Sequence, residues 1–73
     1  MIIDNTVEID SPIYADTEYH SNDELIVYLR NSTSCFIVYG VSEREFLKLQ
    51  KDPSHEAITE LMERKHRDFH SSL

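Results

Sequence analysis

Two histidines near the end of the chain have the spacing of a metal-binding pair. His66 and His70 are four residues apart, so on a helix they would share one face. Imidazole nitrogens at this spacing can bind zinc, but a zinc site needs further ligands. Glu63 is near in sequence, yet these three residues form no recognised ligand set. We therefore expect no metal and interpret the histidines as exposed polar residues beside a basic helix end.

Cys35 and the adjacent acids Asp23 and Glu24 are the other candidates for catalytic chemistry. A cysteine nucleophile needs a histidine base and a group that orients the base, whereas Cys35 begins an apolar segment with no evident orienting Asn or Asp. Paired carboxylates do acid–base work only inside a cleft that perturbs them, and a domain of 73 residues offers little cleft. We therefore assign no catalytic residue and predict that the protein is not an enzyme.

Glycine and cysteine usage excludes other functional classes. Gly40 is the single glycine, so neither a phosphate-binding loop nor a dinucleotide fingerprint can be formed. The acids in residues 16–24 lack the spacing and the glycine of a calcium-binding loop. We expect no cofactor. One cysteine cannot form an internal disulfide, which fits a reducing cytoplasm.

The chain length and the short apolar runs set the fold class. Its 73 residues suffice for one small domain, predicted to span 1–73. The longest apolar runs, 25–29 and 35–39, are far shorter than the ~20 residues of a membrane span, and no signal peptide is expected. A core this small gives a thin stability margin, so we expect a monomer or a weak dimer.

Alternation of apolar residues predicts the strands. Residues 13–20, 25–30 and 35–39 are rich in Ile, Val, Tyr and Thr and are separated by turn-forming residues. In the middle segment Leu25 and Val27 point to one face, and Ile26 and Tyr28 point to the other. Residues 1–10 are interpreted either as an arm or as an extra strand.

Capping residues predict the helices. Ser42 and Glu45 form a capping box, Val41 and Phe46 occupy the staple positions, and Pro53 ends the first helix. Ser54 caps a second helix, whose apolar spacing extends to Phe69, and residues 70–73 are expected to be a frayed tail. The predicted fold is α+β: a short antiparallel meander of three or four strands, packed by one or two C-terminal helices.

Residues 9–54 resemble the KTSC domain family. The resemblance rests on Ser11 before Ile13, the stretch Leu25-x-Val27-x-Leu29, and Phe36-x-Val38-x-x-Val41 before an acidic helix start. Phe36 and Val38 stand where the family has tyrosines, Ser42 replaces its proline, and Ser54 matches its later serine. The downstream Gly and Tyr-Phe-Asn stretch of the family is replaced by residues 55–58, so its ligand site is not carried over. The resemblance implies a β-meander packed by helices, an association with nucleic acid, and no catalysis.

The net charge of −7 is concentrated in the first 29 residues, which contain seven acids and no Lys or Arg. The later residues contain equal numbers of acidic and basic side chains. One interpretation is a solvated acidic face that maintains solubility. The other is a docking surface for a basic partner. The acids that would steer such a partner are Asp4, Glu8, Asp10, Asp16, Glu18, Asp23 and Glu24.

Two functional hypotheses follow. The first is a small acidic regulator that docks on a larger nucleic-acid-processing protein, with RNA polymerase as the first guess and a phage-type inhibitor of host transcription as the class. In this hypothesis Ile26 and Tyr28 would hold the partner. The second is a KTSC-like accessory module that contacts RNA or DNA phosphates through its basic residues. These residues are Arg30, Lys48, Lys51, Arg64, Lys65 and Arg67.

Overall fold

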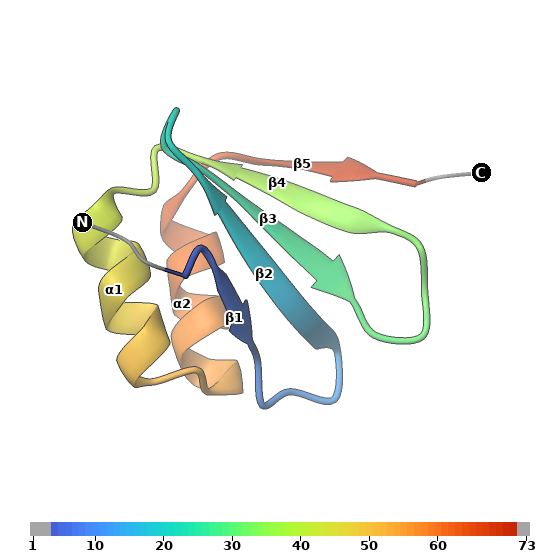
Figure 1. Cartoon of the computed structure of the whole chain (residues 1–73). Helices are drawn as coiled ribbons and strands as arrows, with labels where there is room; N and C mark the ends of the chain where they lie inside the picture. Colours follow the sequence, from blue (N-terminus) through green and yellow to red (C-terminus); the bar gives the residue numbers. More distant parts are fainter. Residues whose placement is uncertain (1–3, 72–73) are drawn as a thin grey trace.

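The computed structural model describes residues 4–71, which form one antiparallel sheet and two helices (Figure 1). The sheet is a five-stranded meander in the order β1-β2-β3-β4-β5, with each strand antiparallel to its neighbours. Its strands are β1 (Thr6–Glu8), β2 (Tyr14–His20), β3 (Glu24–Leu29), β4 (Cys35–Tyr39) and β5 (Arg67–His70). The helices α1 (Glu43–Lys51) and α2 (His55–Arg64) lie between β4 and β5 in the chain and cover one face of the sheet. The α+β prediction is confirmed.

Both helices begin at the predicted serines. The Ser42 hydroxyl accepts a hydrogen bond from the Glu45 amide at 3.1 Å, and the Ser42 amide donates to the Glu45 carboxylate at 3.0 Å. The Ser54 hydroxyl accepts from the Ala57 amide at 3.1 Å. These bonds satisfy amides that have no partner within the helix. The first helix ends at Lys51, immediately before Asp52 and Pro53.

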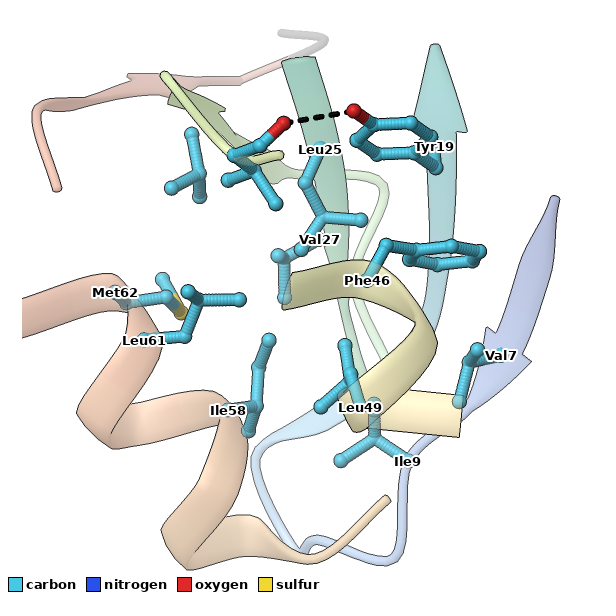
Figure 2. Close-up of a cluster of buried hydrophobic side chains, with 12 residues drawn as sticks. Val7, Ile9, Tyr19, Leu25, Val27, Phe46, Leu49, Ile58, Leu61 and Met62 are labelled. Atoms are coloured by element: carbon cyan, nitrogen blue, oxygen red, sulfur yellow. Dashed lines mark hydrogen bonds between the residues drawn. The ribbon is translucent and has the colours of Figure 1, made fainter. Parts of the chain in front are cut away.

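The core lies between the sheet and the helices (Figure 2). Alternate residues of the strands point toward the helices, so Leu25 and Val27 of β3 are completely buried. The Tyr19 ring stacks on Phe46 at a centroid distance of 4.9 Å. The remaining buried apolar residues are Val7, Ile9, Val38, Val41, Leu49, Ile58, Leu61 and Met62. Neither helix within residues 4–71 is long and apolar enough to cross a membrane.

The C-terminal segment corrects one prediction. The second helix ends at Arg64 instead of continuing to Phe69, and residues 67–70 form the fifth strand. The backbone of Lys65 is extended and marks the end of the helix. Without this strand, the apolar β4 would be an unpaired edge, so its pairing outweighs the helical spacing of the side chains.

Residues near both termini belong to strands of the sheet. Residues 6–8 form a strand, which decides between the arm and the extra strand. His70, which the sequence predicts to lie in a frayed tail, pairs with Cys35 in the sheet. Residues 1–3 and 72–73 lie outside the described part of the chain.

Candidate functional site

The helices leave one face of the sheet uncovered, and apolar side chains occupy its centre. We call this surface the open face; its central residues are Ile26 and Tyr28 of β3 with Cys35, Ile37 and Tyr39 of β4. The strand register sets Ile26 opposite Ile37 and Tyr28 opposite Cys35. Paired residues in antiparallel strands point to the same face, so these side chains form one continuous strip. Tyr28 is 38% exposed, and the other four are half-buried.

Carboxylates line the strip on the side of β1 and β2. Glu8 and Asp16 are exposed and lie opposite each other, and Glu18 lies opposite Ile26. Glu24 lies opposite Tyr39 at one end of the strip. No Lys or Arg occupies a strand position of this face in β1–β5. The open face therefore has an apolar centre with an acidic border.

The other three predicted acids are not part of the open face. Asp4 accepts hydrogen bonds from the hydroxyl and amide of Thr6, and the side-chain bond is the larger reason that its pKa is lowered. The backbone of Asp10 pairs with the backbone of Ser54, just before α2, in an isolated parallel β-bridge. Asp23 lies in the β2–β3 turn with a φ of 62° and accepts a hydrogen bond from Tyr19. The predicted acidic set is thus divided between the open face and the loops and turns outside the strands.

Polar groups of β5, and of His66 just before it, border the strip on its other side. The Tyr39 hydroxyl donates a hydrogen bond to Asp68 at 3.0 Å. This hydrogen bond is the largest reason that the pKa of Tyr39 is raised. The His66 ring stacks on Tyr39 at 5.6 Å, and its Nε2 lies 3.5 Å from the Asp68 carboxylate. Burial, followed by the charge of Glu18, raises the pKa of Tyr28. Both tyrosines therefore present neutral hydroxyl groups at neutral pH.

His20 lies on the open face beside Glu18. Its Nε2 is 2.8 Å from the Glu18 carboxylate, although the angles at this contact fall outside those of a hydrogen bond. His20 and Glu18 therefore form an ion pair when the His20 ring is protonated. His70 lies opposite Cys35 in the register, on the same face.

The predicted basic residues do not form a common surface. Arg30 binds the chain itself: its Nε donates to the Ser11 carbonyl at 3.0 Å, and its Nη2 donates to the carbonyls of Ile9 and Tyr14. Arg67 donates to the Met62 carbonyl at 2.7 Å. These guanidinium groups hold the loop before β2 and the end of α2.

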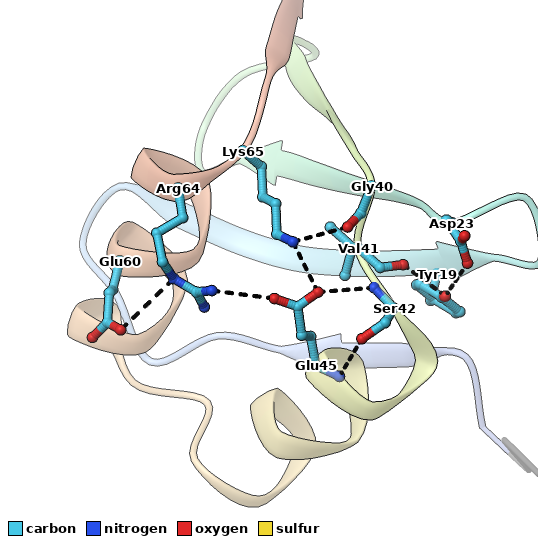
Figure 3. A network of polar contacts seen from close by, with 9 residues as sticks. All are labelled: Tyr19, Asp23, Gly40, Val41, Ser42, Glu45, Glu60, Arg64 and Lys65. Atoms are coloured by element: carbon cyan, nitrogen blue, oxygen red, sulfur yellow. Dashed lines mark hydrogen bonds and ion pairs between the residues drawn. The ribbon is translucent and has the colours of Figure 1, made fainter.

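Arg64 and Lys65 converge on one carboxylate, that of Glu45 (Figure 3). The distances are 3.3 Å from Arg64 and 3.0 Å from Lys65, whose ammonium also donates to the Gly40 carbonyl at 2.9 Å. Burial by itself raises the pKa of Glu45, but hydrogen bonds from Ser42 and Lys65 outweigh it and lower the pKa to about 2. The predicted basic run is therefore divided at the end of α2, and Lys48 and Lys51 lie apart in the last turn of α1.

A partly buried serine–histidine contact was not predicted from the sequence. Ser11 Oγ lies 2.7 Å from His55 Nδ1, and the Tyr14 ring stacks on His55 at 6.0 Å. The same oxygen accepts from the amides of Ile13 and Tyr14 at 3.0 and 3.1 Å. With both lone pairs in use, the hydroxyl donates its hydrogen to the imidazole. This arrangement anchors a turn; the only signal in the sequence was a serine before proline at the start of a strand.

Neither a cluster of metal ligands nor the hollow between the two helices defines a second site in the described part of the chain. Within residues 4–71 no three His, Cys, Asp or Glu side chains converge as metal ligands. His66 and His70 lie outside α2, so they do not share a helical face. A hollow of about 360 Å³ between the helices is lined by both charge signs, including Lys48, Glu60 and Arg64. No protein family, curated protein or solved structure matches this chain, so the KTSC resemblance rests on the residues quoted above.

Proposed function

We propose that this protein is a non-enzymatic binding module whose open face docks on a basic surface of a larger protein. The observation that carries this proposal is the combination of an apolar strip with carboxylates and no Lys or Arg at a strand position of the same face. The five carboxylates are Glu8, Asp16, Glu18, Glu24 and Asp68. Protein interfaces commonly have an apolar centre and a polar border.

The two parts of the face have different roles in the proposed encounter. The carboxylates attract a basic partner over several ångströms and speed its association. Ile26, Ile37 and Tyr28 then lose water against the partner and slow its dissociation. The Tyr28 hydroxyl remains protonated and provides a hydrogen-bond donor at the contact, whereas the hydrogen of the Tyr39 hydroxyl is already donated to Asp68.

The partner that we propose first is RNA polymerase, with the protein acting as an inhibitor of the phage type. Enzymes that hold nucleic acid present basic grooves, and an acidic face fits such a groove by charge. The alternative, a KTSC-like accessory module on RNA or DNA, has less support. Its proposed contacts Arg30, Arg64, Lys65 and Arg67 are engaged within the fold. Carboxylates on the aromatic face would also repel phosphates.

A pull-down from nuclease-treated host lysate tests the proposal by comparing two charge-reversed variants. Glu8→Lys with Asp16→Lys changes the open face, and Glu56→Lys with Glu63→Lys makes the same change of net charge on α2, where both residues are exposed. We expect RNA polymerase subunits to be retained by the wild type and by the α2 variant and lost by the open-face variant.

Two results would count against the proposal. Equal retention by both variants would place the interface elsewhere on the surface. Recovery of proteins only without nuclease would favour the accessory-module alternative, in which nucleic acid forms the link.

A further inference from the structure

The outer edge of β5 is the second surface with a partner-binding geometry. β5 has β4 as its one neighbour in the described sheet and lies at the margin opposite β1 (Figure 1). All four of its residues are exposed, and Phe69 is 57% exposed, more than the other large hydrophobic side chains of the described chain. An edge strand with an exposed aromatic residue is a template for pairing with another strand.

The hydrogen bonds to β4 identify which backbone groups of β5 face outward. The Tyr39 amide donates to the His66 carbonyl at 2.9 Å. Backbone groups alternate in direction along a strand, so Asp68 and His70 also face β4. The amide and carbonyl of Phe69 therefore point away from the sheet, where they can join a further strand.

From this edge we infer that β5 pairs with β5 of a second copy of this chain, antiparallel, with the two-fold axis at Phe69. In this register Phe69 lies opposite Phe69 of the second copy, and its outward amide and carbonyl exchange hydrogen bonds with their equivalents. Asp68 then lies opposite His70 of the second copy, and the symmetry repeats this contact. A register shifted by two residues would set Asp68 opposite Asp68 in one direction and His70 opposite His70 in the other, and only the register centred on Phe69 sets a carboxylate opposite an imidazole.

The surroundings of Phe69 support this pairing. Its ring already contacts Phe36 of β4, edge to face, at 5.2 Å. Pairing at Phe69 would join the two Phe36–Phe69 contacts into one apolar cluster across the dimer, covering a side chain that is exposed in the single chain. The Arg67 guanidinium donates to the Met62 carbonyl of α2, so it is directed toward the helix. This inference does not rest on the proposed partner binding, because it is drawn from the outward backbone groups of β5 and from Phe69, although Asp68 and His70 also border the open face.

Sedimentation equilibrium over a wide range of protein concentration tests the dimer. In His70→Glu, the new glutamate of each copy lies opposite Asp68 of the other copy, so the dimer contains two contacts between acids. We expect dimerisation to weaken about tenfold. Adding Asp68→Lys to this variant restores opposite charges at both contacts and should restore dimerisation. Ser21→Glu, in the exposed β2–β3 turn, is the control for an added negative charge and should leave the dimer unchanged.

Each outcome bears directly on the inference. Loss in the single variant with recovery in the double variant supports pairing in this register. A chain that stays monomeric at every concentration overturns it, and so does a dimer that is insensitive to His70→Glu or is not restored in the double variant. Thermal unfolding followed by circular dichroism verifies that every variant is folded, since Asp68 and His70 are both exposed.

Discussion

Ile26 and Ile37 lie directly opposite each other in the β3–β4 ladder, on the face of the sheet that the helices do not cover. Both side chains are half-buried by their neighbours in the sheet. Two β-branched residues at a cross-strand position stabilise the ladder and also leave an apolar surface in water. The same pair therefore serves the fold and, in the proposed function, the contact with a partner.

Ile37→Thr should separate these two roles. Threonine keeps the β-branched shape that favours a strand, so we expect a loss of about 1 kcal/mol in the free energy of unfolding. The added hydroxyl makes the centre of the open face polar, so partner retention in the pull-down should fall about tenfold or more. Ile13→Thr is the matched control, since Ile13 is 47% exposed and lies before β2. Equal retention of the partner by the two variants would contradict the role of Ile37.

The acid stability of the protein should depend on Glu45. Its pKa is about 2 in the folded chain against an ordinary value of 4.5, so the folded state favours its ionised form. This contribution is fully present above pH 4.5 and is lost as the pH falls toward 2. Glu45→Gln should lower the free energy of unfolding at pH 7 by about 1 to 3 kcal/mol and should flatten its decline in acid. Urea unfolding at several pH values measures both effects.

Glu60→Gln is the control for the acid series. Glu60 lies 3.8 Å from Arg64, but its side chain is 76% exposed, so its ion pair is weak. We expect the control to unfold in acid like the wild type. A Glu45→Gln variant with an unchanged acid profile would show that the Lys65–Glu45 contact does not stabilise the fold.

Tyr19 should limit stability at alkaline pH. Burial first, and then the hydrogen bond to Asp23, raises its pKa to about 12, above its ordinary value of 10. The folded state therefore favours the neutral phenol, and this contribution is present below pH 10 and lost as the pH rises through 12. Tyr19→Phe removes the donor to the Val41 carbonyl at 2.8 Å, so we expect a loss of about 1 to 2 kcal/mol at pH 7 and a weaker alkaline decline.

The alkaline series is measured by denaturant unfolding between neutral pH and pH 12. Tyr39→Phe is the matched control, since its hydroxyl donates to Asp68 at an exposed position. If both tyrosine variants declined equally in alkali, the assignment of the effect to Tyr19 would be wrong.

Arg30→Lys should weaken the fold even though it preserves the charge. The guanidinium donates to three backbone carbonyls, those of Ile9, Ser11 and Tyr14, and a lysine ammonium cannot match this planar arrangement. We expect a loss of about 1 to 2 kcal/mol in the free energy of unfolding. Arg44→Lys, on the exposed first turn of α1, should cost little. Equal stability of the two variants would show that the Arg30 contacts are not stabilising.

Local chemistry made the beginnings of the helices predictable. Ser42 and Glu45 hydrogen-bond to each other across one helical turn, and Pro53 prevents the first helix from continuing, whatever the rest of the chain does. The alternation of Leu25 and Val27 with Ile26 and Tyr28 likewise predicted which side chains face the core, because a strand repeats every two residues. These features depend on residues that are close together in the sequence.

The end of the chain shows where local patterns fail. Met62, Lys65 and Phe69 have helical spacing, but Phe69 pairs with Phe36, which is 33 positions earlier in the sequence. Hydrogen bonds to β4 are available only in the folded sheet, so no pattern within residues 58–70 reveals them. The contact of Ser11 with His55 joins distant parts of the chain in the same way.

The sequence by itself determined the α+β class, the helix starts, the alternating strands and the concentration of acids in the first 29 residues, since each depends on residue type and short-range geometry. Only the tertiary structure decided which of those acids share a surface. Strand pairing brought Glu8, Asp16, Glu18 and Glu24 to the open face, while Asp4, Asp10 and Asp23 were placed in turns and loops. The physical reason is that the distance between charges is set by pairing register and turn geometry, which are fixed by contacts between residues far apart in the chain.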